Sequence, residues 1–397
     1  MTHAHNITRR TFLAAATRAG AATALPALLH RPAPAADADA AGNAAANATT
    51  AAPESLARVV EAGIAEGYCK GAVVLAGTPE EVLLHEAFGH ARVEPEQVAM
   101  HGDSVFDLAS VTKVVAATTA CAACVDKGLV DLDRPLRQYL PEMSGKGIEQ
   151  VTLRQVGAHT SGLDNQKYSP RYRGDAMIRA MLAAAPCREP GSRYEYSCLN
   201  FILLGMVVEK VSGQSLSAFC EEHVFRPLGM TDTRFGPLPD SRRLVGNSVK
   251  EPGQISDEQA RVAGRAVGNA GLFSTAPDLA RFCRMMLHNG QAGGRRVLSE
   301  AVIADMTRRS PAAQSARGFG WDLEPAGRPK ALSDATYYHT GWTGQSMWID
   351  PGSKRYAIVL TNRDHPRPIG SLYQRAKQFR ARVADAALTA CRRGEES

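Results

Sequence analysis

The sequence predicts an α/β fold of the α+β type, in which both ends of the chain build one antiparallel sheet flanked by helices. Strand patterns occur early, at 71–77 and 81–89, and they return late in the chain. Helical patterns dominate from about 130 to 290. Strands at both ends with helices between them indicate one sheet completed by the two termini, with a mainly helical region inserted. The late strand patterns are GFGWDL (318–323), ATYYHTG (335–341), GQSMWID (344–350) and YAIVLTN (356–362).

The expected helices carry apolar residues at helical spacing or end at a clear stop. The first spans PESLARVVEAGIAEG (53–67), directly before the first strand pattern. A long helix begins near Ala109 and ends near Lys127, where Gly128 stops it. Another covers FILLGMVVEKVSG (201–213). The chain closes on an amphipathic helix, whose apolar face is formed by Leu372, Ala376, Phe379, Val383, Ala386 and Ala390.

The N-terminal segment differs in composition from the rest of the chain. Residues 1–36 place the adjacent Arg9 and Arg10 before an alanine-rich, weakly apolar stretch and small residues suited to cleavage. This pattern resembles a twin-arginine signal peptide and predicts an exported, periplasmic protein. A disordered Ala/Pro-rich tail is the alternative. Residues 37–52 are expected to form a low-complexity linker, after which one folded domain begins.

The formal charge of +6 comes mostly from that N-terminal segment. Its four arginines stand without any acidic residue, which leaves +2 of the +6 for the rest of the chain. A balance so close to neutral gives no reason to expect a nucleic-acid partner. Arg18 interrupts the apolar stretch, and no run of 18 apolar residues occurs, so no stable membrane insertion is expected.

Cysteine and histidine spacing gives no sign of a disulfide framework or a metal site. The eight cysteines are irregularly spaced. Cys121 and Cys124 lie in an alanine-rich helical pattern without a second ligand pair, so we expect two small buried apolar residues. His85 and His90 of HEAFGH are one residue too far apart for a zinc-binding His-Glu-x-x-His motif, and they lie on an expected strand. We therefore expect no metal and no organic cofactor.

The segment FDLASVTKVV (106–115) places Ser110 and Lys113 three residues apart at the start of the long helix. This spacing puts both side chains on one face of the helix, with Lys113 about one turn from the hydroxyl. A serine hydroxyl becomes a nucleophile when its proton is removed, and a buried lysine with a lowered pKa can take part in that step. The helix N-terminus adds N–H groups for a developing oxyanion. The alternative is a capping serine beside a solvated lysine.

Two further elements accompany this pair. The sequence HTG (339–341) ends an expected strand, where small residues allow an extended ligand to pair with the backbone. The segment YEYSCLNF (194–201) lies between them and offers the Tyr196 phenol and the Cys198 thiol as reactive groups. A nucleophilic Cys198 would need a companion histidine, which the sequence does not indicate. Tyr194 is the second tyrosine that could occupy the catalytic position.

The order of Ser-x-x-Lys, a Tyr-x-Asn-like element and His-Thr-Gly resembles the serine β-lactamase and penicillin-binding protein superfamily. Within it the chain is similar to the branch of class C β-lactamases, D-Ala-D-Ala carboxypeptidases and related esterases and amidases. The resemblance covers about 53 to 390 and implies a β-lactamase-like serine hydrolase domain at 53–392. The class A Ser-Asp-Asn element is absent from the sequence. The resemblance rests on FDLASVTKVV, GLVDLDRPLRQYLPEM, VTLRQVGAHTSGL, EPGSRYEYSCLNFILLGMVVEKVSG, VFRPLGMTDT, VGNAGLFSTAPDLARFCRMML and HTGWTGQSMWIDP.

The resemblance implies a catalytic role for each matched residue. Ser110 is implied to be the acylated nucleophile, with Lys113 as its proton partner. Tyr196 is implied to pass protons to the leaving group and from the deacylating water, close to the lysine. The backbone N–H groups of Ser110 and Trp342 are implied to form the oxyanion hole. His159, in a turn typical of the family, is expected to be structural.

The same resemblance implies a substrate-binding edge, and there the sequence departs from the family pattern. His339 and Thr340 are implied to hold a carboxylate or polar group of the substrate, with Gly341 leaving room. Histidine replaces the lysine that is typical of class C β-lactamases at position 339. Cys198 occupies the position where the family has an asparagine that contacts the substrate's amide, and a thiol is a poor replacement. Asn200, two residues on, is a candidate to compensate for it.

These observations predict an exported serine hydrolase that forms an acyl-enzyme at Ser110 with a small-molecule acyl substrate. Cell-wall-derived peptides or muropeptides are the first expectation, small esters the second and β-lactams the third. The alternatives are a carboxylesterase, a class C-like β-lactamase, and a penicillin-binding sensor module that does not turn over.

Overall fold

The computed structural model describes residues 54–164, 172–249, 251–311 and 316–396. The expected signal peptide at 1–36 and linker at 37–52 lie outside these residues.

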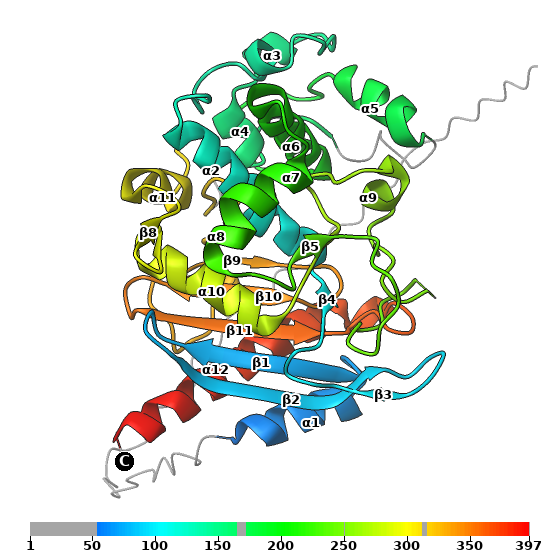
Figure 1. Cartoon of the computed structure of the whole chain (residues 1–397), viewed down its shortest axis with the longest axis vertical. Coiled ribbons are helices and arrows are strands. Elements are labelled where there is room, and N and C mark those ends of the chain that lie inside the picture. The colour runs from blue at the N-terminus through cyan, green and yellow to red at the C-terminus, as the bar shows by residue number, and fades with distance from the viewer. Residues whose placement is uncertain (1–53, 165–171, 250, 312–315, 397) are drawn as a thin grey trace, which may run out of the picture. The chain divides into compact units, whose positions relative to one another are not determined.

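The sheet at the base of the molecule contains strands from both ends of the chain (Figure 1). Its strand order is β3-β2-β1-β11-β10-β9, and every neighbouring pair is antiparallel. The N-terminal β1 and the C-terminal β11 lie side by side at its centre, with Val74 opposite Val359. The predicted closure of one antiparallel sheet by the two termini is therefore confirmed. The strands are β1 (Gly71–Gly77), β2 (Val82–Arg92), β3 (Val98–Ala99), β9 (Tyr337–Thr340), β10 (Ser346–Asp350) and β11 (Arg355–Thr361).

Each face of this sheet is covered by helices, because its central strands alternate their side chains between two apolar layers. Val74 and Val359 pack with α1 (Leu56–Ala65) and α12 (Tyr373–Glu396) on the outer face. Val73 and Ile358 belong to the larger core on the other face, which α10 (Ala276–Leu287) shares with the helical region. Both terminal helices therefore lie on the same side of the sheet, opposite the bulk of the chain (Figure 1).

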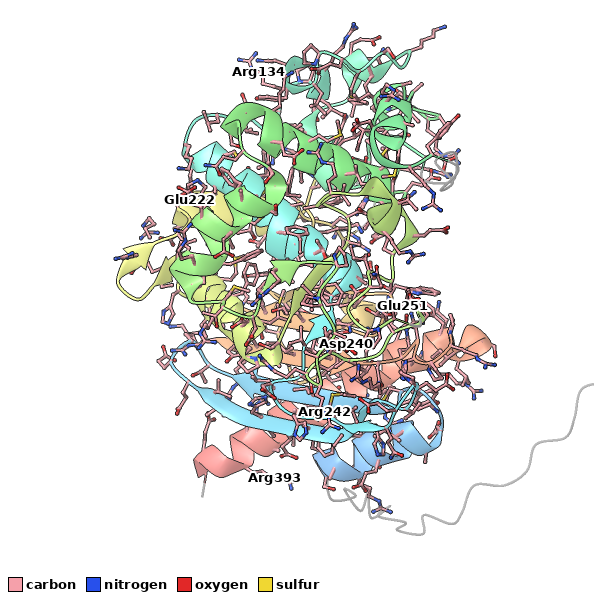
Figure 2. All side chains as sticks on the ribbon, turned by 45° about the vertical axis from the view of Figure 1, so that its right-hand side comes forward. Arg134, Glu222, Asp240, Arg242, Glu251 and Arg393 are labelled. Carbon is pink, nitrogen blue, oxygen red and sulfur yellow. The ribbon has the colours of Figure 1, made fainter. Side chains whose placement is uncertain are left out.

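The helical region occupies the middle of the chain, as the sequence predicts, with three short strands and a small hairpin among the helices. Charged side chains such as Arg134, Glu222, Asp240 and Glu251 are exposed on its surface and on the loops that join it to the sheet (Figure 2). Its elements are β4 (Phe106–Asp107), α3 (Leu136–Tyr139), η3 (Ile148–Gln150), α4 (Leu153–Gly157), α5 (Gly174–Leu182), α6 (Cys198–Ser212), α7 (Leu216–Cys220), η4 (Glu221–Phe225), α8 (Arg226–Leu228), β5 (Arg234–Phe235), α9 (Glu258–Ala263), β6 (Leu272–Ser274), β7 (Gln291–Ala292), β8 (Arg295–Arg296) and α11 (Glu300–Thr307).

The long helix expected from Ala109 to Lys127 consists of three successive helical segments of different geometry. A 3-10 turn, η1 (Ala109–Val111), leads into a π-helical segment, η2 (Lys113–Thr118), and then into α2 (Thr119–Asp126). The Thr119 hydroxyl donates to the carbonyl of Val114, five residues earlier, within the wide part of the helix. π-Helical turns inside helices occur frequently at functional sites.

This helix is also apolar and long enough to span a membrane by composition, over Ala109–Asp126. Within the fold, 83% of that stretch is buried, since it runs through the middle of the large core. A central core helix has the same composition for the same reason, namely that all its sides contact other apolar groups.

One predicted strand is absent: GFGWDL (318–323) forms no strand in this structure. Gly320 has a φ of 83°, and the Gly318 amide donates to the carbonyl of Trp321, so the segment folds into a tight turn. A side chain at Gly320 would meet the Thr118 hydroxyl at 2.3 Å. The segment is apolar because Trp321 is buried in the core. Its Asp322 forms an isolated antiparallel bridge with Tyr338 of β9, but this pairing does not extend into a strand.

Candidate active site

The turn before the long helix presents Ser110 in a constrained backbone conformation. Ala109 has a φ of 44°, a region that non-glycine residues rarely adopt. The buried Asp107 stabilises this turn, because its carboxylate accepts from the Ala109 amide at 2.9 Å and from the Ser256 amide at 2.8 Å. Burial raises the pKa of Asp107, while these two amides act in the opposite direction. Asp107 is therefore a positioning residue for the serine.

Ser110 Oγ accepts two hydrogen bonds from groups that come from different elements. The Lys113 ammonium, on η2, donates at 3.0 Å, and the Tyr196 hydroxyl, directly before α6, donates at 2.8 Å. Tyr196 lies 86 residues from Ser110 in the chain. Of the three residues predicted as catalytic, Lys113 and Tyr196 thus both form a hydrogen bond with Ser110.

Lys113 is fully buried, and its ammonium group contacts three acceptors. Besides Ser110, these are the carbonyl of Asn269 at 2.8 Å and the sulfur of Cys198 at 3.5 Å. Burial lowers the pKa of Lys113, but the neighbouring Cys198 and Tyr196 outweigh it and raise the pKa above its usual value. In the resting site the lysine is therefore protonated, and it acts as a charged donor to Ser110.

Tyr196 is neutral beside that charge. Burial raises the pKa of its phenol, and the Lys113 cation opposes that effect. Part of the Tyr196 side chain remains open to solvent, at 38% exposure, so a substrate can reach this side of Ser110. Tyr194, the other candidate tyrosine, lies with its ring 4.6 Å from the Arg317 guanidinium. The hydrogen bond to Ser110 comes from Tyr196, which favours that residue as the catalytic tyrosine.

His159 packs against the ring of Tyr196. Its ring lies 4.5 Å from the Tyr196 ring, and its Nδ1 accepts from the Ser197 amide at 3.1 Å. Burial, together with the charges of Arg317 and Lys113, lowers the pKa of His159 well below its usual value. The imidazole is therefore neutral, and the structural role expected for it agrees with its position.

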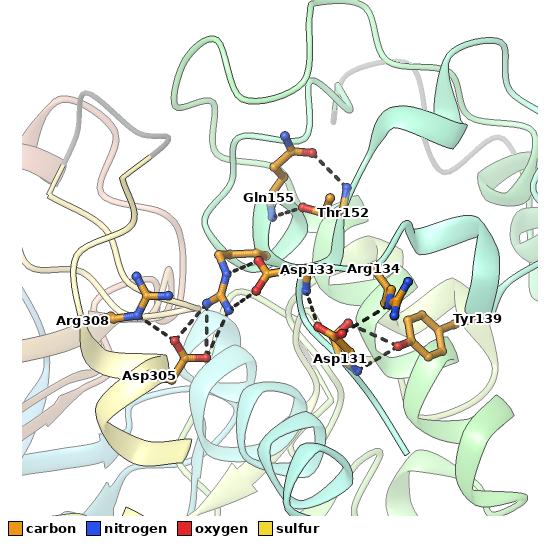
Figure 3. Close-up of polar contacts among 9 residues, drawn as sticks. Asp131, Asp133, Arg134, Tyr139, Thr152, Gln155, Asp305 and Arg308 are labelled. Atoms are coloured by element: carbon orange, nitrogen blue, oxygen red, sulfur yellow. Dashed lines mark hydrogen bonds and ion pairs between the residues drawn. The ribbon is translucent and has the colours of Figure 1, made fainter. Parts of the chain in front are cut away.

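A polar network anchors the helix that precedes His159 (Figure 3). Thr152 and Gln155 form a reciprocal capping box at the start of α4. Arg154 on the same helix donates to Asp133 at 2.6 Å and to Asp305 of α11 at 3.1 Å, so α4 is tied to two distant segments. This fixed helix end determines where His159, and through it Tyr196, can lie.

Asn200 does not reach the catalytic cluster, which corrects the expectation that it compensates for Cys198. Its side chain is fully buried, accepts from the Ser161 hydroxyl at 2.7 Å and contacts His159 Nδ1 at 3.4 Å. The two positions lie in the first turn of α6, but a separation of two residues points their side chains in different directions. Of Cys198 and Asn200, it is Cys198 whose side chain contacts the Lys113 ammonium.

The HTG segment ends β9 beside the nucleophile, as predicted. Thr343, in the turn after β9, donates to the carbonyl of Asp107 at 2.9 Å, which joins the two segments. A side chain at Gly341 would lie 2.6 Å from the carbonyl of Leu108, so only glycine permits this close approach. The buried Arg380 of α12 donates to the carbonyl of Gln345 at 2.6 Å and holds the far side of the turn.

His339 and Thr340 differ in their access to a substrate. The His339 side chain is only 3% exposed, and its Nδ1 contacts the carbonyl of Thr340 at 3.0 Å. Burial and the charges of Lys113 and Arg317 lower the pKa of His339 well below its usual value. A buried neutral imidazole does not supply the positive charge that a lysine offers a carboxylate, whereas Thr340 is partly exposed.

Trp342 follows the HTG segment, and its side chain is 49% exposed at the edge of the site. Its ring stacks on Tyr373 with 5.5 Å between ring centres, and the Arg363 guanidinium lies 4.4 Å from it. The backbone amide of Trp342 remains the predicted partner of the Ser110 amide in an oxyanion hole.

Three features of the site escaped the sequence analysis. Asp107 and the Asn269 carbonyl both lie inside the segments that carry the family resemblance, so their proximity to Ser110 and Lys113 could have been suspected. The third feature is the contact between the Cys198 thiol and the Lys113 ammonium, which the thiol makes at the position where the family has an asparagine. Among the residues that the structure describes, no three histidine, cysteine or acidic side chains gather as metal ligands.

Comparison with known proteins agrees with this geometry. The family model named Beta-lactamase matches residues 56–379. The chain belongs to the beta-lactamase family. This family contains serine hydrolases, and the matched residues include Ser110, Lys113 and Tyr196.

Named relatives cover most of the chain. A protein of Salmonella schwarzengrund, provisionally named a D-alanyl-D-alanine carboxypeptidase, is 29% identical over 332 residues, which are 72% of this chain and 76% of that protein. Among solved structures, the penicillin-binding protein homologue of Caulobacter crescentus has a TM-score of 0.65 at 23% identity, over 84% of this chain and 96% of that one.

Two further structures show the same fold. EstCE1, described as a hydrolase with promiscuous acyltransferase activity, has a TM-score of 0.66 at 24% identity, over 83% of this chain and 97% of that one. A class C beta-lactamase has a TM-score of 0.67 at 20% identity, over 84% and 96% of the two chains. At these identities the likeness concerns the fold alone.

Three buried histidines, His159, His339 and His365, predict a stability that falls with acidification. Burial lowers their pKa values in the folded protein, so below about pH 6.5 the unfolded chain binds more protons than the folded one. The free energy of unfolding should therefore decrease as the pH falls from 7 to 5, by up to about 1.4 kcal/mol per pH unit for each histidine. Urea unfolding at several pH values measures this.

The control for this prediction is a matched pair of variants. His159→Asn should reduce the pH dependence, since it removes one of the three buried histidines, whereas substitution of the exposed His101 by asparagine should leave it unchanged. An equal slope in the parent and in His159→Asn would contradict the assignment of His159 as a buried neutral histidine.

Proposed function

We propose that the protein is an exported serine hydrolase that forms an acyl-enzyme at Ser110 and acts on amide, peptide or ester bonds. The observation that carries the proposal is the pair of hydrogen bonds from Lys113 and Tyr196 to Ser110 Oγ, at 3.0 and 2.8 Å. A serine held by two proton-transferring groups on a constrained turn fits nucleophilic catalysis, and a capping serine would need neither of them.

The charge state of the site defines the first chemical step. Lys113 is charged and Tyr196 is neutral at rest, so the reactive form has one proton fewer on this pair. In that form the pair takes the Ser110 proton as Oγ bonds to the substrate carbonyl carbon, and the carbonyl electrons move onto its oxygen. The Ser110 and Trp342 amides then stabilise the oxyanion. Tyr196 returns the proton to the leaving group, which departs as an amine or an alcohol.

Deacylation reverses the roles. A water molecule loses its proton to the Tyr196–Lys113 pair, adds to the acyl carbon, and Ser110 leaves with the proton restored. Tyr196 is partly open to solvent, so water can approach from its side of the ester.

Cell-wall-derived peptides or muropeptides are the substrates we propose first. Support comes from the curated relatives, which are provisionally named D-alanyl-D-alanine carboxypeptidases. A carboxylesterase activity is the second candidate, and two observations favour it. His339 is buried and neutral, so it offers little to a substrate carboxylate, and Cys198 replaces the amide that would bind an acylamino group.

Replacement of Tyr196 by phenylalanine should reduce kcat about 10²- to 10⁴-fold, because the variant lacks the proton shuttle while keeping the ring that packs on His159. In the parent, kcat/KM should rise with pH as the Tyr196–Lys113 pair loses its proton. Steady-state hydrolysis of p-nitrophenyl acetate measures both quantities. Ser110→Ala should abolish turnover.

Tyr194→Phe is the matched control, since Tyr194 packs against Arg317 and should keep nearly the parent activity. A non-turnover sensor would show a single acylation without steady-state release in the parent. That result, or equal turnover in the parent and in Ser110→Ala, would refute the enzyme proposal.

Cys198→Asn should increase acylation by substrates that carry an acylamino group. The amide would replace the thiol at Lys113 and add a donor and an acceptor, which corresponds to about 2- to 13-fold for one hydrogen bond. Acylation of the protein by benzylpenicillin, followed by mass spectrometry, should accelerate relative to p-nitrophenyl acetate hydrolysis. Cys198→Ser is the control of similar size, and an equal gain with serine would show that the amide is not responsible.

Export through a twin-arginine pathway follows from the sequence of residues 1–36. Changing both Arg9 and Arg10 to lysine should leave the protein in the cytoplasmic fraction, whereas the parent should be recovered from the periplasm. Cell fractionation with detection of the full-length and shortened chains tests this. A periplasmic double variant would contradict the assignment of the signal.

A further inference from the structure

The Trp342 side chain is a large, exposed apolar group on the loop that contacts the nucleophile turn. Its neighbour Thr343 donates a hydrogen bond to the carbonyl of Asp107, which lies three residues before Ser110. The preceding Gly341 lies close to the carbonyl of Leu108, so the loop that carries Trp342 is fixed against the nucleophile turn on both sides of this residue. The backbone of Trp342 is therefore held against the nucleophile turn, and the exposed indole extends from that point.

The indole is also held in place, although nearly half of it faces solvent. Tyr373 stacks on it with an angle of 28° between the ring planes, and the Arg363 guanidinium lies 4.4 Å from Trp342 and 4.6 Å from Tyr373. Arg363 is itself buried, at 1% exposure, and its backbone amide donates to the carbonyl of Thr343. A side chain fixed in this way forms a rigid flat surface, which costs a ligand little conformational entropy to bind.

Among the residues that the structure describes, this exposed aromatic surface differs from the other tryptophans. Trp321 and Trp348 are each 1% exposed and belong to the two cores. The Trp342 ring packs with one aromatic ring, Tyr373, and with the Arg363 guanidinium. The positive charge behind the ring draws its π electrons away from the exposed face and favours an electron-rich partner on that face.

We infer that the Trp342 side chain forms a substrate subsite that stacks on a planar aromatic group next to the scissile ester or amide. This inference rests on the proposed function and names a substrate class for it: acyl compounds that carry an aryl ring on the acyl or the leaving-group side. The backbone of Trp342 and its side chain thus have separate roles, one on the oxyanion and one on the ring.

The test compares aromatic and saturated substrates of equal size. One pair is p-nitrophenyl phenylacetate and p-nitrophenyl cyclohexylacetate, and the other is benzyl acetate and cyclohexylmethyl acetate. A methylene group separates the ring from the reacting centre in every case, so intrinsic reactivity within each pair is similar. In at least one pair the parent protein should prefer the aromatic member by about three- to tenfold in kcat/KM, as expected for ring stacking.

The variants then assign that preference to the indole. Trp342→Ala should bring the ratio to about one, and Trp342→Phe should retain part of it, since both keep the backbone amide. Leu129→Ala is the control, because Leu129 is another exposed apolar residue, at 41%, and lies at the far end of the catalytic helix. It should keep the parent ratio.

The outcomes separate this inference from the proposed function. If the parent shows no aromatic preference in either pair, or if the preference survives in Trp342→Ala, the subsite does not exist. Ser110-dependent hydrolysis of cyclohexylmethyl acetate in the same experiment would still support the hydrolase. If no substrate is hydrolysed, binding is measured instead in Ser110→Ala, where phenylacetate but not cyclohexylacetate should quench the fluorescence of the exposed Trp342. Absence of that difference overturns the subsite.

Discussion

The buried charge of Lys113 is the constraint on which the rest of the site depends. An ammonium group in a core is costly unless every proton has an acceptor, and here Ser110, Cys198 and the Asn269 carbonyl supply them. These acceptors come from three separate parts of the chain. Satisfying one charge therefore fixes the nucleophile turn, the start of α6 and the segment before β6 relative to one another.

Other polar groups around the site are also buried, and each of them makes a contact that holds part of the site in place. Asp107 holds the Ala109 turn, His159 holds Tyr196, and Thr343 links the β9 edge to the nucleophile. Each is buried, so each contact is made in a medium where hydrogen bonds are strong and unpaired groups are costly. The site is consequently rigid on its sheet side, and its open parts are Tyr196 and Trp342.

Much of the fold was predictable because its signals are local. Short apolar runs bounded by turn residues indicated the strands at both ends, and Gly128 marked the end of the catalytic helix. The GFGWDL segment was predicted as a strand but forms a tight turn with one bridge, from Asp322 to Tyr338, because an apolar stretch around a buried tryptophan resembles a strand in sequence. Whether Asn200 replaces the missing amide was open in the sequence, because the direction of its side chain depends on how α6 packs against Ser161 and His159.

The sequence by itself indicated the candidate reactive groups, because the helical spacing of Ser110 and Lys113 and the motif around Tyr196 together resemble one family. Only the tertiary structure decided which tyrosine donates to the serine, and which neighbour of Lys113 replaces the missing amide. It also decided that His339 is buried and neutral and that the Trp342 ring is exposed. The physical reason is that burial, and with it charge state and access, arises from contacts between segments distant in the chain, such as β9 with the nucleophile turn.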